Sequence, residues 1–199
     1  MQEQYIHLNG GKIHCLKFGS GSRYLLAFHG FGENAGSFLH LRPVLEKTFT
    51  VLSIDFPFHG KSEWKADTFT SADLLNLIRE LQQQEQFRTF SLIGFSMGGK
   101  VSLHLLQNLP ELVEEVFLIA PDGIKTHKVF DIAVYPIWGR KIFKAVMKKP
   151  KPFFTVLTWL KKARLVDKFH YDFARNHMNT AEKRDRIYHT WMSLKYLSV

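Results

Sequence analysis

The sequence contains a single cysteine, Cys15, and no long apolar run. One thiol excludes a disulfide framework, and no apolar stretch reaches the roughly 18 residues that a membrane-spanning helix needs. The first ten residues, MQEQYIHLNG, also lack the basic and then apolar pattern of a secretory leader. We therefore expect a cytoplasmic protein in which Cys15 packs within a strand and takes no part in chemistry.

Acidic side chains are scarce beyond residue 124. Residues 1–124 hold 10 Lys and Arg against 13 Asp and Glu, whereas residues 125–199 hold 17 against 5, within a formal net charge of +9. Such a positive potential attracts anions, among them nucleic acid, anionic lipid and acidic substrates. We favour a solvated helical face over these possibilities, and we expect no nucleic-acid partner.

Short apolar runs alternate with helical patterns in the first part of the chain. The segment YIHLNGGKIHCLKFG predicts a hairpin in which Asn9-Gly10 supplies the positive φ angles of the turn. Continuous apolar runs then predict strands buried on both faces, as in parallel sheets. These runs are RYLLAF, FTVLSIDF, TFSLIGF and EEVFLIAP, with helices expected over 37–47, 71–84 and 97–109. The alternation predicts an α/β fold with a mostly parallel, doubly wound sheet.

Helical patterns alone follow residue 124. They cover 128–148, 152–164, 166–177 and 180–197, with Pro150 and Pro152 at one break. Asn179 and Thr180 are candidate N-caps of the last helix, and Glu182 fits a capping box with Asn179. We therefore expect two domains, an α/β core over 1–124 and a helical lid over 125–199.

One serine lies at the apex of a glycine-flanked turn. Gly94-Phe95-Ser96-Met97-Gly98 follows a strand pattern and opens a helix, which is typical of a nucleophile elbow. Gly94 to Lys100 also fits the phosphate-binding pattern G-x-x-x-x-G-K. That site needs Ser or Thr next, to ligate magnesium, and Val101 has no oxygen to offer. We therefore favour the elbow, with Ser96 as the nucleophile.

Three motifs together resemble those of the α/β-hydrolase superfamily, specifically its esterase and C–C-bond hydrolase branch. They are HGFG at 29–32, DFPFHGKS at 55–62 and GFSMGG at 94–99. The resemblance covers residues 1 to about 124. It implies that Ser96 attacks a substrate carbonyl, and that the backbone N–H groups of Phe31 and Met97 form the oxyanion hole. Phe58 stands where the family usually has glycine, which leaves the size of the substrate open.

The partners that would activate Ser96 are hard to find. In the family that the chain resembles, the acid and the histidine follow strands beyond the lid, whereas this sequence stops at LKYLSV. Asp122 is a weak candidate acid, because the PDG sequence around it is typical of a turn. The four histidines of the second half, His127, His170, His177 and His189, are expected on helix faces. No zinc-ligand spacing is present, so we expect no metal and no other cofactor.

We therefore expect a carboxylesterase-like serine hydrolase that acts on a small-molecule ester or related acyl substrate. The fold would be incomplete at the C-terminal edge of its sheet, and the chain would be a partial form with little activity. The alternative is a non-catalytic binding or lipid-interacting module, which would form an oligomer if the chain truly ends at Val199. Aromatic residues beside lysines in the lid leave peripheral membrane contact open.

Overall fold

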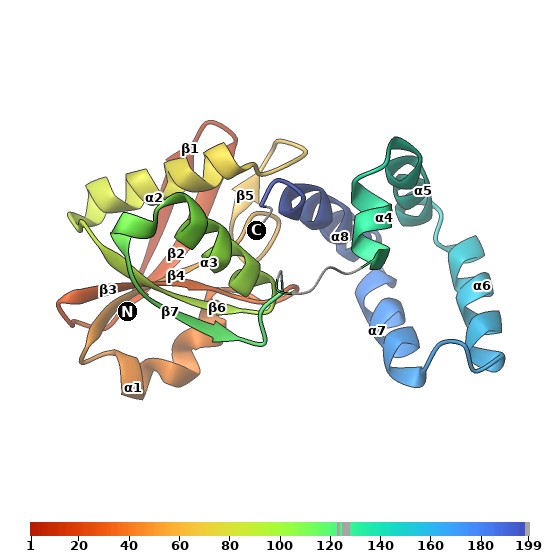
Figure 1. Ribbon diagram of the computed structural model, residues 1–199, viewed down its shortest axis with the longest axis horizontal. Helices are drawn as coiled ribbons and strands as arrows, with labels where there is room; N and C mark the ends of the chain where they lie inside the picture. Colours follow the sequence, from red (N-terminus) through yellow and green to blue (C-terminus); the bar gives the residue numbers. More distant parts are fainter. Residues whose placement is uncertain (123, 125–127, 198–199) are drawn as a thin grey trace. The chain divides into compact units, whose positions relative to one another are not determined.

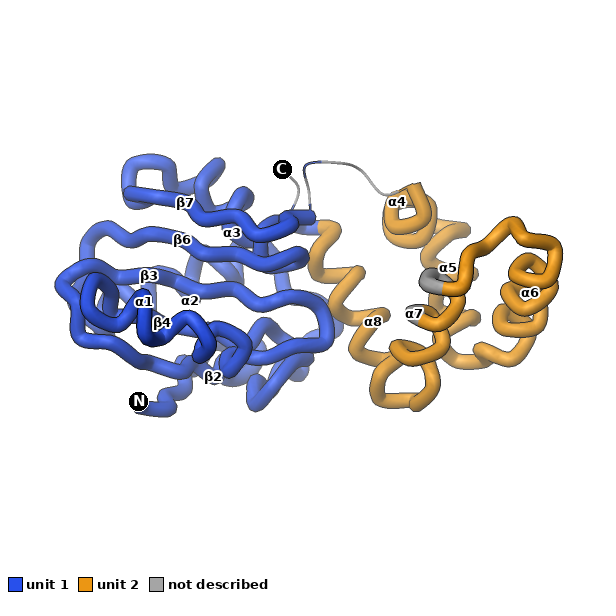
Figure 2. The backbone as a smooth tube through the Cα atoms, turned by 90° about the horizontal axis from the view of Figure 1, so that it is seen from below, with its two compact units in different colours: residues 1–125, 196–199 blue, residues 126–195 orange. Residues whose placement is uncertain are grey.

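The structure is a computed structural model that describes residues 1–122, 124 and 128–197, with the backbone alone for Phe169, His170 and Phe173. The chain forms two compact units (Figure 2). The first comprises Met1–Lys125 together with Tyr196–Val199, and the second comprises Thr126–Lys195. Tyr196 and Leu197 thus group with the first unit, although the sequence analysis placed them in the helical lid.

The first unit is built on a mixed sheet whose central strands run parallel. Its strands are β1 (Gln2–Leu8), β2 (Gly11–Phe18), β3 (Arg23–Phe28), β4 (Phe49–Ile54), β5 (Glu63–Trp64), β6 (Phe90–Phe95) and β7 (Val113–Ile119). The order is β1-β2-β4-β3-β6-β7, with β5 paired to β2. β2 pairs antiparallel with β1, β4 and β5, whereas β4, β3, β6 and β7 run parallel. The α/β class and the mostly parallel, doubly wound sheet are confirmed.

The hairpin between β1 and β2 forms as expected, but its backbone differs from the prediction. Leu8 pairs with Gly11 across the two-residue loop, and the positive φ angle, 153°, belongs to Gly11 instead of Asn9 or Gly10. A Cβ atom on Gly11 would lie 2.0 Å from the carbonyl oxygen of Glu63. The close approach of β5, which the sequence analysis did not anticipate, therefore fixes where glycine is required.

Burial follows the predicted pattern in the central strands and departs from it in β7. Every residue of β4 is buried, and so is most of β3 and β6. β7 alternates between half-buried and exposed positions, and Phe117 and Ile119 are 41% and 44% exposed. The apolar run of β7 was expected to be covered on both faces. That expectation is wrong because β7 is the edge strand of the described sheet.

The helices of the first unit cover both faces of its sheet. They are η1 (Ala35–Leu41), α1 (Arg42–Leu45), α2 (Ser71–Glu85), α3 (Met97–Asn108) and η2 (Pro110–Leu112). Figure 1 shows α2 and α3 on one face and α1 on the other. The helix expected over 37–47 is split into η1 and α1, because Pro43 has no N–H to continue a helical ladder. The Thr70–Asp73 capping box starts α2.

In the described residues of the second unit, all regular elements are helices. Its helices are α4 (Lys128–Val134), α5 (Ile137–Lys148), α6 (Lys151–Lys162), α7 (Lys168–Met178) and α8 (Ala181–Leu194). The helix expected over 128–148 is broken at Pro136, whose extended backbone precedes α5. Thr180 caps α8 by accepting from the Lys183 N–H, so the capping box predicted from Asn179 is wrong. In the part of the chain that the structure describes, each helix is too short or too polar to cross a bilayer.

Candidate active site

Ser96 occupies a strained turn between β6 and α3. Its φ and ψ angles are 49° and −115°, a combination that L-residues rarely adopt and that costs about 1–3 kcal/mol. Two backbone hydrogen bonds hold the turn against β7 and the residues that follow it. The Ser96 N–H donates to the carbonyl of Ile119 at 3.0 Å, and the Asp122 N–H donates to the carbonyl of Ser96 at 2.9 Å. These hydrogen bonds therefore fix the Ser96 backbone, and with it the origin of the side chain, at the carboxyl edge of the sheet.

Glycines allow the backbone to close around this turn. A Cβ atom on Gly98 would lie 1.8 Å from the Phe28 carbonyl oxygen, and one on Gly94 would lie 2.4 Å from the Gly98 oxygen. A Cβ atom on Gly99 would lie 2.4 Å from Cβ of Pro121. Real Cβ atoms do not come so close to backbone, so the glycines of G-x-S-x-G-G are required by contacts with β3, α3 and the segment after β7.

The Ser96 hydroxyl is hydrogen-bonded to a carboxylate. It donates to Oδ2 of Asp122 at 3.3 Å, and the Ser96 side chain is half-buried. The structure thus brings the weak candidate acid directly to the candidate nucleophile. Among the described residues, no histidine nitrogen forms a hydrogen bond with this hydroxyl. A histidine between the two groups, as in a serine–histidine–acid relay, is therefore not part of this geometry.

The loop after β3 lies beside the Ser96 turn. Phe28 and Gly94 are register partners in the parallel pair of β3 and β6, so the residues after each strand meet at one edge. A Cβ atom on Gly30 would lie 2.8 Å from the Phe95 ring, which places the loop carrying Phe31 against the elbow. Met97 is the first residue of α3, where backbone N–H groups have no partner within the helix. Both N–H groups of the predicted oxyanion hole therefore belong to segments that meet at this edge.

Two buried histidines near this edge are engaged in shaping loops. His29 Nε2 accepts from the Phe56 N–H at 3.0 Å, which leaves the proton on Nδ1, 2.7 Å from the Gly30 carbonyl oxygen. His59 Nδ1 lies 3.0 Å from the Pro57 carbonyl oxygen, and its ring packs 5.2 Å from that of His29. Because the basic nitrogen of His29 is occupied, this residue links the loops after β3 and β4 and is unsuited to act as a base.

The aspartate of the second motif anchors the loop that follows it. The Asp55 carboxylate accepts from the Lys61 N–H at 2.7 Å and lies 2.7 Å from Nδ1 of His14 on β2. Gly60 has a φ of 53°, and a Cβ atom there would overlap the Asp55 carboxylate at 2.0 Å. Phe58 has a φ of 69°, which is unusual for an aromatic residue and falls where glycine is usual in the family that the sequence resembles. These contacts assign Asp55 a structural role.

The remaining candidate bases and ligands lie elsewhere. His189 Nε2 is 3.4 Å from Oδ1 of Asp185 within α8. His127 lies outside the described residues, as does the side chain of His170. Within the described chain, no three His, Cys, Asp or Glu side chains form a group that could hold a metal ion.

Known proteins resemble this chain in both sequence and fold. The sequence model of the family described as alpha/beta hydrolase fold matches residues 24–143. A serine hydrolase-like protein from Danio rerio is 35% identical over 119 residues, which cover 57% of this chain and 35% of the relative. The chain spans about a third of the length of the curated relatives that it matches.

Two solved structures illustrate the likeness in fold. A hypothetical protein from Pseudomonas aeruginosa PAO1 is 25% identical, with a TM-score of 0.57 over 78% of this chain and 53% of its own. The epoxide hydrolase CorEH is 19% identical, with a TM-score of 0.61 over 99% of this chain and 75% of its own. At such identities the likeness speaks for the fold and leaves the reaction open.

Proposed function

The chain belongs to the alpha/beta hydrolase fold family, and on that premise we propose that it is a serine hydrolase in which Ser96 attacks an ester carbonyl. The substrate class is a small-molecule carboxylic ester or related acyl compound, because ester hydrolysis makes the fewest demands on such a site. The serine hydrolase-like relative from Danio rerio supports the reaction class. A cytoplasmic location, expected from the sequence, stays a prediction.

The observation that carries the proposal is the backbone of Ser96. A φ of 49° with a ψ of −115° costs free energy, and two backbone hydrogen bonds and three glycine contacts sustain it. A serine that only capped α3 would need none of this, and the Ser96 side chain forms no capping hydrogen bond. The arrangement is explained if the hydroxyl has to stand clear of the sheet to meet a substrate.

The developing oxyanion would be stabilised by backbone N–H groups. We assign this role to Phe31 in the loop after β3 and Met97 at the start of α3, as the resemblance of their motifs implies. A helix N-terminus adds a partial positive charge to such a site. Loss of one oxyanion donor typically costs about 100- to 1,000-fold in rate, so this pair would account for a large part of the catalysis.

Proton transfer is the incomplete part of the mechanism. Asp122 accepts the Ser96 hydrogen bond, and a carboxylate is a weak base toward an alcohol. We propose that a histidine from outside the described residues takes the proton in the active enzyme, with Asp122 orienting the hydroxyl. Without such a histidine in place, the described residues would support only slow hydrolysis that depends on the nucleophile and the oxyanion hole.

The alternative is a non-catalytic binding module, and hydrolysis of p-nitrophenyl acetate by the 199-residue chain separates the two. We expect slow, saturable release of p-nitrophenol above the buffer rate. It should vanish in Ser96→Ala and persist in Ser37→Ala, a serine of η1 whose side chain plays no part in the elbow. Equal rates in the Ser96→Ala and wild-type proteins would contradict the proposal, and a wild-type rate equal to that of buffer would favour the binding module.

A further inference from the structure

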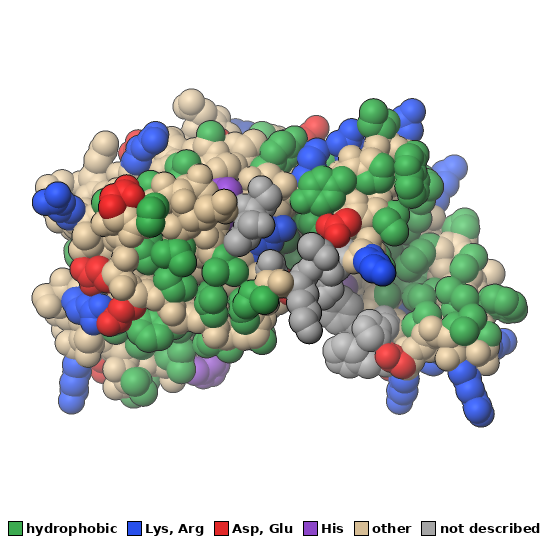
Figure 3. Space-filling model, viewed as in Figure 1, with side chains coloured by type: hydrophobic (Ala, Val, Ile, Leu, Met, Phe, Trp, Pro, Cys, Tyr) green, Lys and Arg blue, Asp and Glu red, His purple; other side chains and the backbone are tan. Residues whose placement is uncertain are grey.

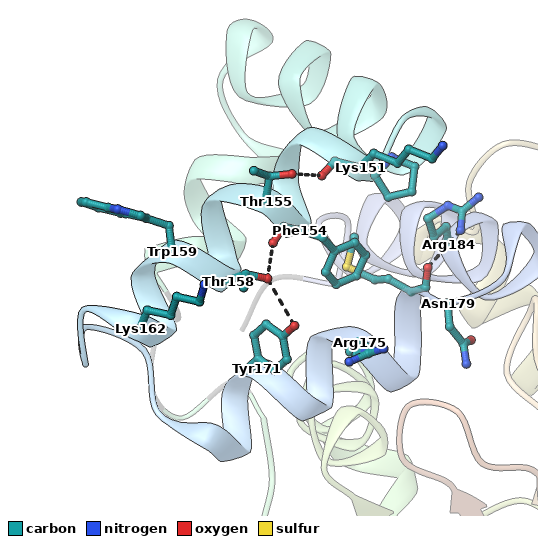
Figure 4. Close-up of a pocket in the computed structure, with 12 residues that line it drawn as sticks. Lys151, Phe154, Thr155, Thr158, Trp159, Lys162, Tyr171, Arg175, Asn179 and Arg184 are labelled. Atoms are coloured by element: carbon teal, nitrogen blue, oxygen red, sulfur yellow. Dashed lines mark hydrogen bonds between the residues drawn. The ribbon is translucent and has the colours of Figure 1, made fainter.

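The helical unit contains a pocket of its own between α6 and α7. Its volume is about 860 Å³, within the range of roughly 300–1,000 Å³ typical of small-molecule sites (Figure 4). The walls come from α6, from α7 and from the segment that leads into α8. All of the lining residues belong to the second unit, so the pocket is defined within that unit alone.

The ionisable side chains that contribute charge to this pocket are basic. They are Lys151, Lys162, Arg175 and Arg184, and none of the described lining residues is acidic. Arg184 has a structural role, because it donates to the carbonyl oxygens of Met147 at 2.8 Å and Met178 at 3.0 Å. In the described part of the chain, no carboxylate forms an ion pair with the other three. Their positive potential is therefore not neutralised by an ion pair with a described carboxylate.

A hydroxyl pair links α6 and α7 beside these charges. The Tyr171 hydroxyl lies 3.2 Å from that of Thr158, and Figure 4 shows the two pointing toward one another. The hydrogen bond with Thr158, together with the positive charges of Arg175 and Lys161, lowers the pKa of the Tyr171 phenol. Lys161 lies 4.0 Å from the centre of the Tyr171 ring. The polar end of the pocket thus stabilises negative charge.

Along α6, in contrast, apolar side chains are exposed. None of the residues of this helix is buried, although its sequence between the terminal lysines is PFFTVLTWL. Phe154 and Met178 line the pocket itself, and Trp159, which is 65% exposed, stands at its rim. Exposed apolar side chains of this kind, green in Figure 3 beside the blue lysines and arginines, are typical of surfaces that bind an apolar ligand.

We propose that this pocket binds one anionic amphiphile, with its acidic head beside Lys162, Arg175 and Tyr171 and its alkyl chain along Phe154 and Met178. The ligand chemistry is a carboxylate or phosphate group on a long alkyl chain. Because basic and apolar side chains line the same pocket, a single molecule that carries both an acidic group and an alkyl chain can contact them together. The proposal concerns the second unit alone and does not depend on hydrolysis at Ser96.

Calorimetric titration of the 199-residue chain with dodecyl phosphate, below its critical micelle concentration, tests the proposal. We expect one saturable site per chain. Two control ligands should each bind at least tenfold more weakly than dodecyl phosphate. Dodecanol has the same alkyl chain without the charge, and inorganic phosphate has the charge without the chain. Arg175→Gln and Lys162→Gln should each weaken dodecyl phosphate by about tenfold. Lys141→Gln, an exposed lysine of α5 outside the pocket lining, should leave affinity unchanged.

Circular dichroism melting establishes that each variant is folded, and Lys162, which is exposed, carries the test if Arg175→Gln proves unstable. Equal affinity for dodecanol and dodecyl phosphate would overturn the proposal, because the charge would then be irrelevant. Equal loss in Lys141→Gln would overturn it as well, since a general electrostatic effect would explain the binding. So would binding to anionic phosphatidylglycerol vesicles without binding of monomeric dodecyl phosphate, which would indicate a surface site.

Discussion

Ser96 is the residue at which backbone strain and side-chain chemistry meet. Its unfavourable φ angle is maintained by hydrogen bonds from two directions, and its hydroxyl contacts the carboxylate of Asp122. Strain that the surroundings sustain in this way tends to be associated with function, because a purely structural position would relax. The proposed function therefore depends on the reactivity of the Ser96 oxygen and on the group that holds it.

Removing the carboxylate of Asp122 should weaken the reactivity of Ser96 without unfolding the turn. Asp122→Ala deletes the acceptor at 3.3 Å but keeps the Asp122 backbone N–H that bonds Ser96. A hydrogen bond to a charged group contributes about 1.5–3 kcal/mol. The rate at which a fluorophosphonate modifies Ser96 should therefore fall by about 10- to 100-fold. Asp131→Ala, in the first turn of α4, is the control. An unchanged rate in Asp122→Ala would show that Asp122 serves only the turn.

Cys15 should be inert in the folded protein. Burial raises the pKa of its thiol from 9.0 to about 12, so at pH 8 the reactive thiolate is present at only about one part in ten thousand. We expect no alkylation by iodoacetamide in native buffer and complete alkylation in 8 M urea, measured by intact mass. Rapid modification of the native chain at pH 8 would contradict the buried environment.

The same shift makes stability depend on pH. Above about pH 9 the unfolded chain releases the Cys15 proton while the folded chain keeps it. The contribution of the buried thiol to the free energy of unfolding is therefore lost as the pH rises toward 12. Between pH 9 and 10.5, the free energy of unfolding should fall more steeply in the wild type than in Cys15→Ala. The difference in slope should approach ~1.4 kcal/mol per pH unit. The prediction would be wrong if urea denaturation gave parallel curves of unfolding free energy against pH for the wild type and Cys15→Ala.

Residue roles could be predicted from the sequence only in part. The motif around Ser96 predicted the strained turn, because the glycine spacing follows from local sterics. The contact with Asp122 could not be derived, since it depends on how far the segment after β7 folds back onto the elbow. Arg175 and Tyr171 were not singled out at all. The pocket that they line exists only because α6 and α7 pack together, and helical periodicity does not determine that pairing.

Among the elements, the junction of β6 and α3 is the most demanding of its sequence. Gly98→Ala would place a methyl group 1.8 Å from the Phe28 carbonyl oxygen, so β3 and α3 would have to separate. We expect a loss of more than ~2 kcal/mol of unfolding free energy and the loss of Ser96 reactivity. In Gly36→Ala the nearest atom is a side-chain oxygen at 2.9 Å, and the loss should stay below ~1 kcal/mol. Similar midpoints for the two variants in urea would contradict the close approach.

Element types were predicted better than element ends. The helices over 71–85 and 97–108 lie within a residue of the expected bounds, because strong apolar periodicity marks them. The helix expected over 128–148 is broken at Pro136 into α4 and α5. A proline can kink a helix or end it, and the sequence alone does not show which of the two occurs. β7 has the composition of a covered strand and yet is exposed, because composition does not reveal whether a neighbour is present.

At the scale of the whole molecule, two uncovered apolar surfaces stand out. One is the edge strand β7, where Phe117 and Ile119 are 41% and 44% exposed. The other is α6 in the helical unit. That unit as a whole also carries most of the positive charge of the chain. Monomeric proteins rarely leave such surfaces without a partner. Peripheral contact with an anionic membrane through the basic lid stays a prediction, which the vesicle titration addresses.

In the 199-residue chain, the β7 surface should mediate self-association. An unpaired strand edge with exposed apolar side chains is a template for pairing with another chain. We expect concentration-dependent dimers in sedimentation velocity experiments, and a shift to monomer in the double variant Phe117→Lys and Ile119→Lys. Val44→Lys changes an apolar residue of α1 that is 77% exposed, and it should leave the distribution unchanged. Equal distributions in both variants would exclude β7 as the contact.

The central claim is that Ser96 is a nucleophile, and mapping a covalent adduct tests it most directly. The chain would be treated with a fluorophosphonate and digested with trypsin, which releases residues 89–100 between Arg88 and Lys100. We predict that fragmentation spectra place the adduct on Ser96, that Ser91 in the same peptide remains unmodified, and that Ser96→Ala prevents labelling. An adduct on Ser91, or labelling that persists in Ser96→Ala, would contradict the account.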